Sequence, residues 1–92
     1  MPDIPILTTE VPQQGNYNPV GVVSGHFSVG KGTVTDRILE GMNNCMQQIR
    51  VQAELMGGNE IFAARVNICE AGRHPGLVVV MITGTAVAVQ GE

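Results

Sequence analysis

The chain is poor in aromatic residues and in charges. It has no Trp, one Tyr and two Phe among 92 residues, although 43% of its residues are apolar. Its core must therefore be built from Val, Ile, Leu, Met and Ala, and such a core is marginal unless further copies of the chain add to it. Charged residues make up only 14% of the chain, which is low for an ordinary soluble surface. This shortage favours self-association.

Basic residues and cysteines are also scarce. Five Lys and Arg stand against eight Asp and Glu, for a net charge of −3, which counts against a surface for nucleic acid or anionic membrane. The apolar stretch 77–90 is too short for a membrane span. Met1-Pro2-Asp3 lacks the basic segment and apolar run of a secretory signal. We therefore expect a cytoplasmic protein with reduced thiols, folded as one domain over residues 1–92.

The stretch from Leu77 to Gln90 has 14 residues without a charge. As one strand it would extend about 46 Å, whereas a compact domain of this length is only about 32 Å across. Either the strand bends, with Gly84 as the candidate position, or neighbouring subunits cover it. We expect the surplus apolar surface around Gly84 to Val89, on the sheet face away from the helix. The stretch thus favours a homo-oligomer.

Apolar residues recur every three or four positions from Ile38 to Met56. This spacing predicts a helix over residues 36–56 with one apolar face. Thr33 or Thr35 can cap its start, and Gly57-Gly58 can end it because glycine adopts the left-handed conformation readily.

Four stretches are typical of strands: residues 4–9, 20–29, 59–70 and 77–90. Pro5 restricts the first to a sheet edge, and the glycines within 20–29 indicate a bulge or a close approach of another backbone. Alternation in the third directs one set of side chains towards the helix (Phe62, Ala64, Val66, Ile68) and another set away from it (Arg65, Asn67, Cys69). The fold class is α+β, an antiparallel sheet with one long helix packed on a face, in the order ββαββ.

The segment from Gly25 to Thr33 matches the glycine and lysine spacing of a phosphate-binding loop. Such loops wrap phosphates with backbone amides and favour small residues, whereas His26, Phe27 and Val29 are bulky. No later apolar strand ends in an Asp that would hold magnesium. A strand, a glycine turn and a capped helix explain the segment better than nucleotide binding does.

The soft metal ligands are His26, His74, Cys45 and Cys69, and no two of them have the close spacing of a zinc site. Cys45 belongs to the apolar face of the helix, where we expect it in the core. Cys69 is the better candidate for a reactive or ligating thiol, although an inert interface cysteine is the favoured interpretation.

A polar row, Arg65, Asn67 and Cys69, leads to a turn that holds Glu70, Arg73 and His74. The row could line a pocket between subunits, and the turn could supply acid–base groups. A solvated loop with an interfacial salt bridge explains the same residues and is favoured. No Ser-His-Asp or Cys-His pairing supports catalysis.

Several short pieces, in this order and spacing, resemble the YbjQ-like family of small bacterial proteins, which carry a heavy-metal-binding label. They are Ile6-Leu-Thr-Thr9, Gly21-Val-Val-Ser-Gly25, Ala53-Glu-Leu-Met-Gly57 running into Asn59-Glu-Ile-Phe-Ala63, and Gly84-Thr85-Ala86-Val87. The resemblance implies a homopentameric ring of α+β subunits. The chain departs from the family between the second strand and the helix, where residues 28–35 replace a longer insert. The resemblance supplies no catalytic residues and no metal ligands.

These observations predict a non-enzymatic homo-oligomer, a pentamer by the resemblance, that binds a small molecule or a soft metal ion between subunits. The candidate ligand or interface residues are Arg65, Asn67, Cys69 and His74, and the sequence names no cofactor. Two alternatives stay open. One is a scaffolding ring that recruits a protein partner, and the other is an enzyme with an interfacial site around Glu70, Arg73 and His74.

Overall fold

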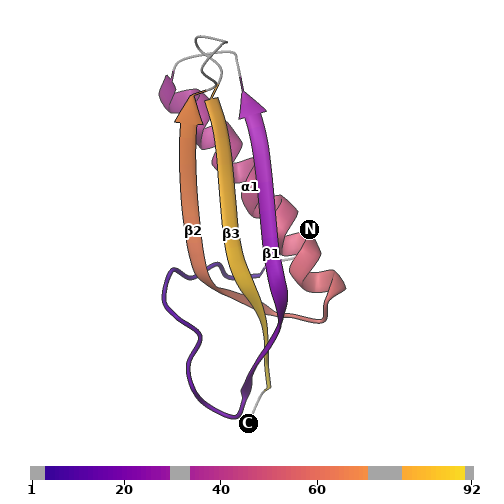
Figure 1. The fold of residues 1–92 in the computed structure, drawn as a ribbon. Helices are drawn as coiled ribbons and strands as arrows, with labels where there is room; N and C mark the ends of the chain where they lie inside the picture. Colours follow the sequence, from indigo (N-terminus) through magenta and orange to yellow (C-terminus); the bar gives the residue numbers. More distant parts are fainter. Residues whose placement is uncertain (1–3, 30–33, 71–77, 91–92) are drawn as a thin grey trace.

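Three strands form a sheet, and one helix lies across a face of it (Figure 1). The computed structural model describes residues 4–29, 34–70 and 78–90. The elements are β1 (Tyr17–Val29), α1 (Val34–Leu55), β2 (Glu60–Glu70) and β3 (Val78–Val89). The strand order is β1-β3-β2, and both pairings are antiparallel. The predicted α+β class, with one long helix on an antiparallel sheet, is confirmed.

The helix forms where the apolar spacing predicts it and ends at the two glycines. The Gly58 N–H donates to the Ala53 carbonyl at 2.8 Å, and the Gly57 N–H donates to the Glu54 carbonyl at 3.0 Å. Gly57 has a φ of 84°, so this is the left-handed glycine turn that satisfies the last carbonyls of a helix. Of the two predicted caps, Thr33 lies outside the described residues and Thr35 lies inside α1, after its first residue Val34.

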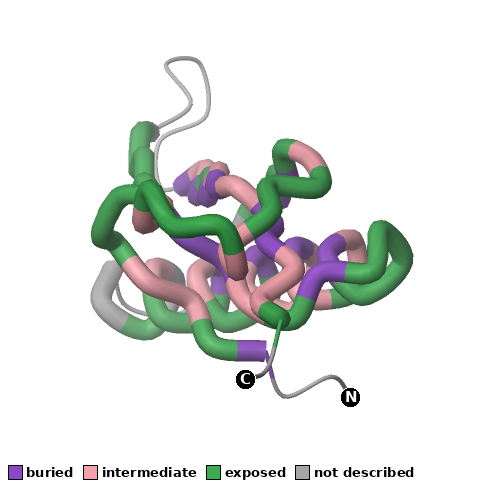
Figure 2. The backbone as a smooth tube through the Cα atoms, turned by 90° about the horizontal axis from the view of Figure 1, so that it is seen from below, coloured by how far each residue is buried: buried purple, intermediate pink, exposed green. Residues whose placement is uncertain are grey.

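The core lies between α1 and the sheet, on the β1 and β3 side. A Cβ added at Gly25 of β1 would lie 2.9 Å from the backbone carbonyl oxygen of Cys45, so this glycine lets helix and strand approach closely, as predicted. A register shift between Pro19 and Gly21 adds a bulge below it. The largest fully buried side chains are Val23, Cys45, Ile49, Ile61, Val80, Ile82 and Val87. Seen from below in Figure 2, buried stretches lie in the interior and exposed backbone lies around them.

Residues 4–9 do not form the first strand of the predicted ββαββ order. They make a single parallel bridge, Ile6 with Ile61. The Ile61 N–H donates to the Pro5 carbonyl at 2.9 Å, and the Leu7 N–H donates to the Ile61 carbonyl at 2.8 Å. Pro5 has no N–H, which prevents a regular ladder. The described order is therefore β1-α1-β2-β3, although the segment does lie at a sheet edge, as Pro5 predicts.

A bulge in β2 reverses part of the predicted alternation. The register with β3 shifts between Phe62 and Arg65, and Ala63 has a φ of 56°. An extra residue in one strand turns the side chains before it to the other face. Phe62 therefore lies on the face away from the helix, against prediction, and its ring meets that of Tyr17 edge-on, with centroids 5.8 Å apart.

The long strand β3 is continuous, and the molecule is elongated to hold it. Its extents are 50 × 24 × 18 Å and its radius of gyration is 14.7 Å, against about 12 Å for a compact domain of this length. Gly84 allows close packing against β2, because a Cβ there would lie 2.8 Å from Ile61 Cγ2.

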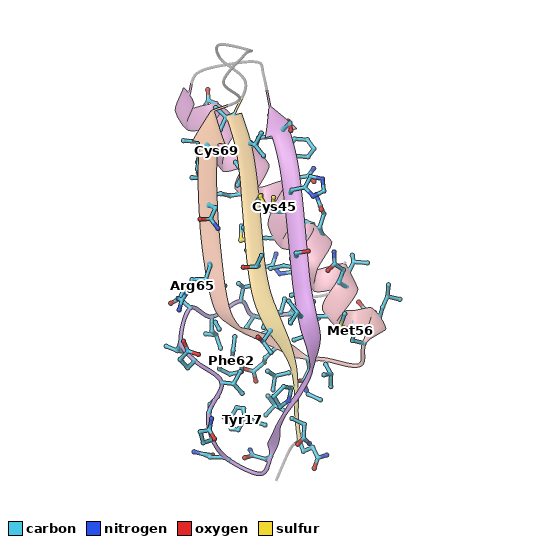
Figure 3. All side chains as sticks on the ribbon, viewed as in Figure 1. Tyr17, Cys45, Met56, Phe62, Arg65 and Cys69 are labelled. Carbon is cyan, nitrogen blue, oxygen red and sulfur yellow. The ribbon has the colours of Figure 1, made fainter. Side chains whose placement is uncertain are left out.

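The predicted surplus of exposed apolar surface around Gly84 to Val89 is wrong, because Gly84, Ala86 and Val87 are buried. The Tyr17–Phe62 pair lies at this lower end, in Figure 3.

Candidate functional site

The exposed surface of the sheet lies at its other end, on the face turned away from α1. We call this the open face. Its positions follow from the register and from the alternation of side chains along each strand. They are Val22, Ser24, His26 and Ser28 of β1, Val79, Met81 and Thr83 of β3, and Arg65, Asn67 and Cys69 of β2. None of these residues is buried.

The register arranges the open face in rows that run across all three strands. Met81 pairs with His26 on one side and with Asn67 on the other. The next row joins Ser28, Val79 and Cys69, and the row below joins Ser24, Thr83 and Arg65. Side chains in directly opposed pairs have Cβ atoms about 4.5–5.5 Å apart. The rows thus combine a thioether, an imidazole, an amide and a thiol on one uncovered surface.

Three of the four predicted site residues share this surface. Arg65, Asn67 and Cys69 are all exposed and point away from the helix, as the alternation predicts. Figure 3 shows Arg65 and Cys69 along β2. His74 lies outside the described residues, as does Arg73, and the side chain of Glu70 is not described. A site that unites the row with the turn therefore stays a prediction.

Arg65 contributes the charge of the row. Its Nη2 atom lies 3.5 Å from Oε1 of Glu10, with both side chains mostly exposed to solvent. Salt screens such a surface pair, and it contributes little to stability. The arginine can therefore leave Glu10 for a better-placed anion at little cost.

The two cysteines have opposite environments. Cys45 is fully buried, and its Sγ donates to the Val80 carbonyl at 3.2 Å, which confirms the core interpretation. Burial raises the pKa of the Cys45 thiol, because the thiolate would lose its hydration. Cys69 is an exposed free thiol on the open face. Of the two, only Cys69 is accessible to a ligand or a reagent.

Within the described ranges, no group of three or more His, Cys, Asp or Glu side chains lies close enough together to hold a metal ion. In the same part of the chain, no helix is both long and apolar enough to cross a bilayer.

Two hollows lie away from the open face. One, of about 240 Å³, is formed at the lower end by Val11, Pro12, Gln13, Gln14, Tyr17 and Pro19. The other is a wide depression along α1, lined by Asn44, Gln47, Gln48, Val51 and Gln52. Neither includes a predicted site residue or an acidic or basic side chain, so neither resembles a catalytic cleft.

Sequence reasoning missed a contact between α1 and the outer edge of β1. Gln52 accepts from the Ser24 N–H at 3.0 Å and donates to the Ser24 carbonyl at 2.7 Å. Gln48 does the same with His26, at 3.3 and 2.9 Å. We call this pair the glutamine clasp. The four-residue spacing of the two glutamines was its signal in the sequence, but it is equally typical of a solvated helix face.

No protein-family model matches this chain, and no curated protein matches it. Its fold is similar to a crystal structure of a protein of unknown function from Pediococcus pentosaceus ATCC 25745, which is assigned to the DUF74 family. The TM-score is 0.75 over 92% of this chain and 96% of that one, at 20% sequence identity. At this identity the likeness extends to the fold alone.

Proposed function

We propose that this protein is a non-enzymatic homo-oligomer that binds a small molecule or a soft metal ion where subunits meet on the open face. The observation that carries the proposal is the open face itself. It spans three strands, holds the exposed thiol Cys69, and carries Arg65 as its charged side chain among uncharged ones.

Exposed apolar side chains support assembly. Val22 is 73% exposed and Met81 is 43% exposed on the open face. On the helix side of β2, Val66 and Ile68 are 44% and 45% exposed. Single exposed apolar residues need no explanation, but Val66 and Ile68 project on the same side of one strand and form a small apolar patch of the kind found at interaction sites. The low share of charged residues in the chain favours a second copy of the same chain as the partner.

The resemblance to the YbjQ-like family adds a subunit number to the proposal, since it implies a pentameric ring. The fold shared with the protein from Pediococcus pentosaceus is compatible with that resemblance. The ligand class follows from the side chains on the open face. A thiol, a thioether and an imidazole suit a soft metal ion, and the Arg65 and Asn67 side chains suit the oxygen atoms of a small molecule.

Native mass spectrometry tests the proposal on untagged protein purified without chelators. We expect the mass of several subunits together with a retained small molecule or metal ion. Met81→Glu would place a carboxylate in the middle of the open face, and burying it at an interface is costly. This variant should lose subunits and ligand, whereas Glu54→Gln on the exposed surface of α1 should keep both.

A stable monomer at micromolar concentration would contradict the proposal. An oligomer that retains no ligand and dissociates through Met81→Glu would contradict the binding role and favour the scaffolding alternative. Turnover of a substrate that His74→Ala abolishes without loss of subunits would contradict the non-enzymatic role.

A further inference from the structure

The two edges of the sheet differ in how their backbone groups are satisfied. On β1, the glutamine clasp occupies the outward N–H and C=O groups of both Ser24 and His26. An edge strand with such groups free is a template for pairing with another chain. The clasp therefore closes the middle of the β1 edge to a further strand.

The edge of β2 is only half closed. Backbone groups of residues 5–9 are hydrogen-bonded to the lower part of this edge. There the Ala64 N–H donates to the Leu7 carbonyl at 3.0 Å, and the Ala63 N–H donates to the Thr9 carbonyl at 2.7 Å. Because backbone groups alternate along a strand, those of Val66 and Ile68 point outward like the N–H of Ala64. Within the described residues, no hydrogen-bond partner lies on that side of Val66 or Ile68.

We propose that this open edge of β2 pairs with β2 of a second copy, antiparallel and centred on Asn67. The inference rests on the proposed homo-oligomer and specifies one of its contacts. In this register Val66 lies opposite Ile68 of the second copy, and the two residues exchange both backbone hydrogen bonds. Asn67 lies opposite Asn67 of the second copy, and Arg65 lies opposite Cys69 of the second copy.

Other registers fit less well. Centring on Val66 places Ile68 opposite Ala64, whose N–H is already bonded to Leu7. Centring on Ile68 places Val66 opposite the charged Glu70, and centring on Arg65 opposes two like charges, which is destabilising. Of these registers, only the one centred on Asn67 pairs apolar with apolar and polar with polar residues without competing for a backbone group that is already bonded.

The pairing also joins the helix-side apolar patch of the two copies. Val66 and Ile68, which α1 leaves almost half exposed, would cover one another across the new edge. On the opposite side, the two sets of Arg65, Asn67 and Cys69 become neighbours in a six-stranded sheet. The proposed ligand surface is then completed by the second copy.

A pairing of identical edges has two-fold symmetry, so it predicts an even number of subunits. A dimer satisfies it, and so does a decamer if the five-membered ring also forms. A continuous sheet that joins β2 of one copy to β1 of the next is blocked by the glutamine clasp.

Single-cysteine variants test the pairing. In a Cys69→Ala background, Asn67→Cys places a thiol directly opposite the same thiol of the second copy. Mild oxidation should then convert most of the protein into a disulfide-linked dimer. Ser24→Cys, on the same face but on β1, is the matched control. Its thiols would be about 24 Å apart across five strand spacings, so it should stay largely uncrosslinked.

Ile68→Lys provides a second test, because a half-exposed position tolerates lysine in the folded subunit while the charge opposes Val66 of the second copy. It should halve the subunit number in native mass spectrometry, whereas Val51→Lys, at an equally exposed helix position, should leave it unchanged. An odd-numbered assembly, or equal crosslinking of the two cysteine variants, overturns the pairing but leaves the homo-oligomer intact. A monomer overturns both.

Discussion

At the scale of single residues, Ala63 adopts a backbone conformation that its side chain disfavours. Its φ of 56° lies in the left-handed region, which costs an L-residue about 1–2 kcal/mol and costs glycine almost nothing. The position creates the bulge that turns Phe62 to its observed face. The strain is therefore tied to the packing at the lower end of the sheet.

Ala63→Gly should raise the free energy of unfolding by up to about 1 kcal/mol, because glycine relieves this strain. Ala63→Val should lower it, since a β-branched residue fits the left-handed region worse. Urea unfolding followed by circular dichroism measures both. A loss of stability in Ala63→Gly would contradict the role of backbone strain here.

The buried thiol of Cys45 makes stability depend on pH. Its pKa is raised in the folded protein, so above the ordinary cysteine pKa of about 8.5 the unfolded chain releases the proton and the folded one retains it. The stability is thus complete below that pH and falls as the pH rises towards the folded-state pKa. Cys45→Ala should show a flatter fall above about pH 8.5 in the same unfolding measurement. An identical slope in both proteins would contradict this account.

At the scale of elements, the helix and its end were predictable, and the details of the sheet were less so. The apolar spacing from Ile38 to Met56 and the Gly57-Gly58 pair are local signals, and they located α1 to within two residues at each end. The bulge at Ala63 has no glycine or other local mark, so strict alternation misplaced Phe62. Tertiary packing decides that position.

The candidate site was predictable in part for the same reason. Alternation placed Arg65, Asn67 and Cys69 on one face, because that stretch lies beyond the bulge. Their alignment with Met81 and His26 depends on strand register, which a single sequence does not specify. The glutamine clasp depends on how closely α1 lies to β1. Gly25 permits this close approach, but a glycine within a strand does not by itself predict it.

The glutamine clasp should contribute to stability and to protection of the β1 edge. Replacing both Gln48 and Gln52 with Ala removes the bonds to Ser24 and His26, at about 0.5–1.5 kcal/mol for each bond lost. The doubly substituted protein should be less stable and should aggregate faster on heating, because the freed edge accepts other strands.

Light scattering during a thermal ramp, beside urea unfolding, measures both effects. Glu54→Ala is the control, because it also introduces Ala on an exposed part of α1 but touches neither Ser24 nor His26. Equal aggregation of the two proteins would contradict the protective role of the clasp.

At the scale of the whole molecule, the subunit is a long, narrow two-layer plate. Its extents of 50 × 24 × 18 Å leave much of the sheet without cover, since a helix of 22 residues spans about 33 Å at 1.5 Å per residue. The open face itself arises because α1 covers only one side of the sheet (Figure 1).

Small-angle scattering should report this shape. If the assembly is disrupted, for example by Met81→Glu, the radius of gyration should approach that of the elongated subunit, 14.7 Å for the Cα atoms, and not the roughly 12 Å of a compact domain. Intact wild-type protein should give a clearly larger value. A disrupted subunit with the compact value would contradict the elongated fold.

The central position of β3 also determines when the protein can fold during synthesis. β1 and β2 each pair with β3 and not with one another, yet β3 leaves the ribosome after both. Until then β1 has only the helix to pack against, and its pairing with β3 joins residues about 50–70 positions apart. Such distant contacts fold slowly and leave strands exposed meanwhile. The nascent chain therefore depends on its last strand, and stalled translation before residue 78 would release a product without a sheet.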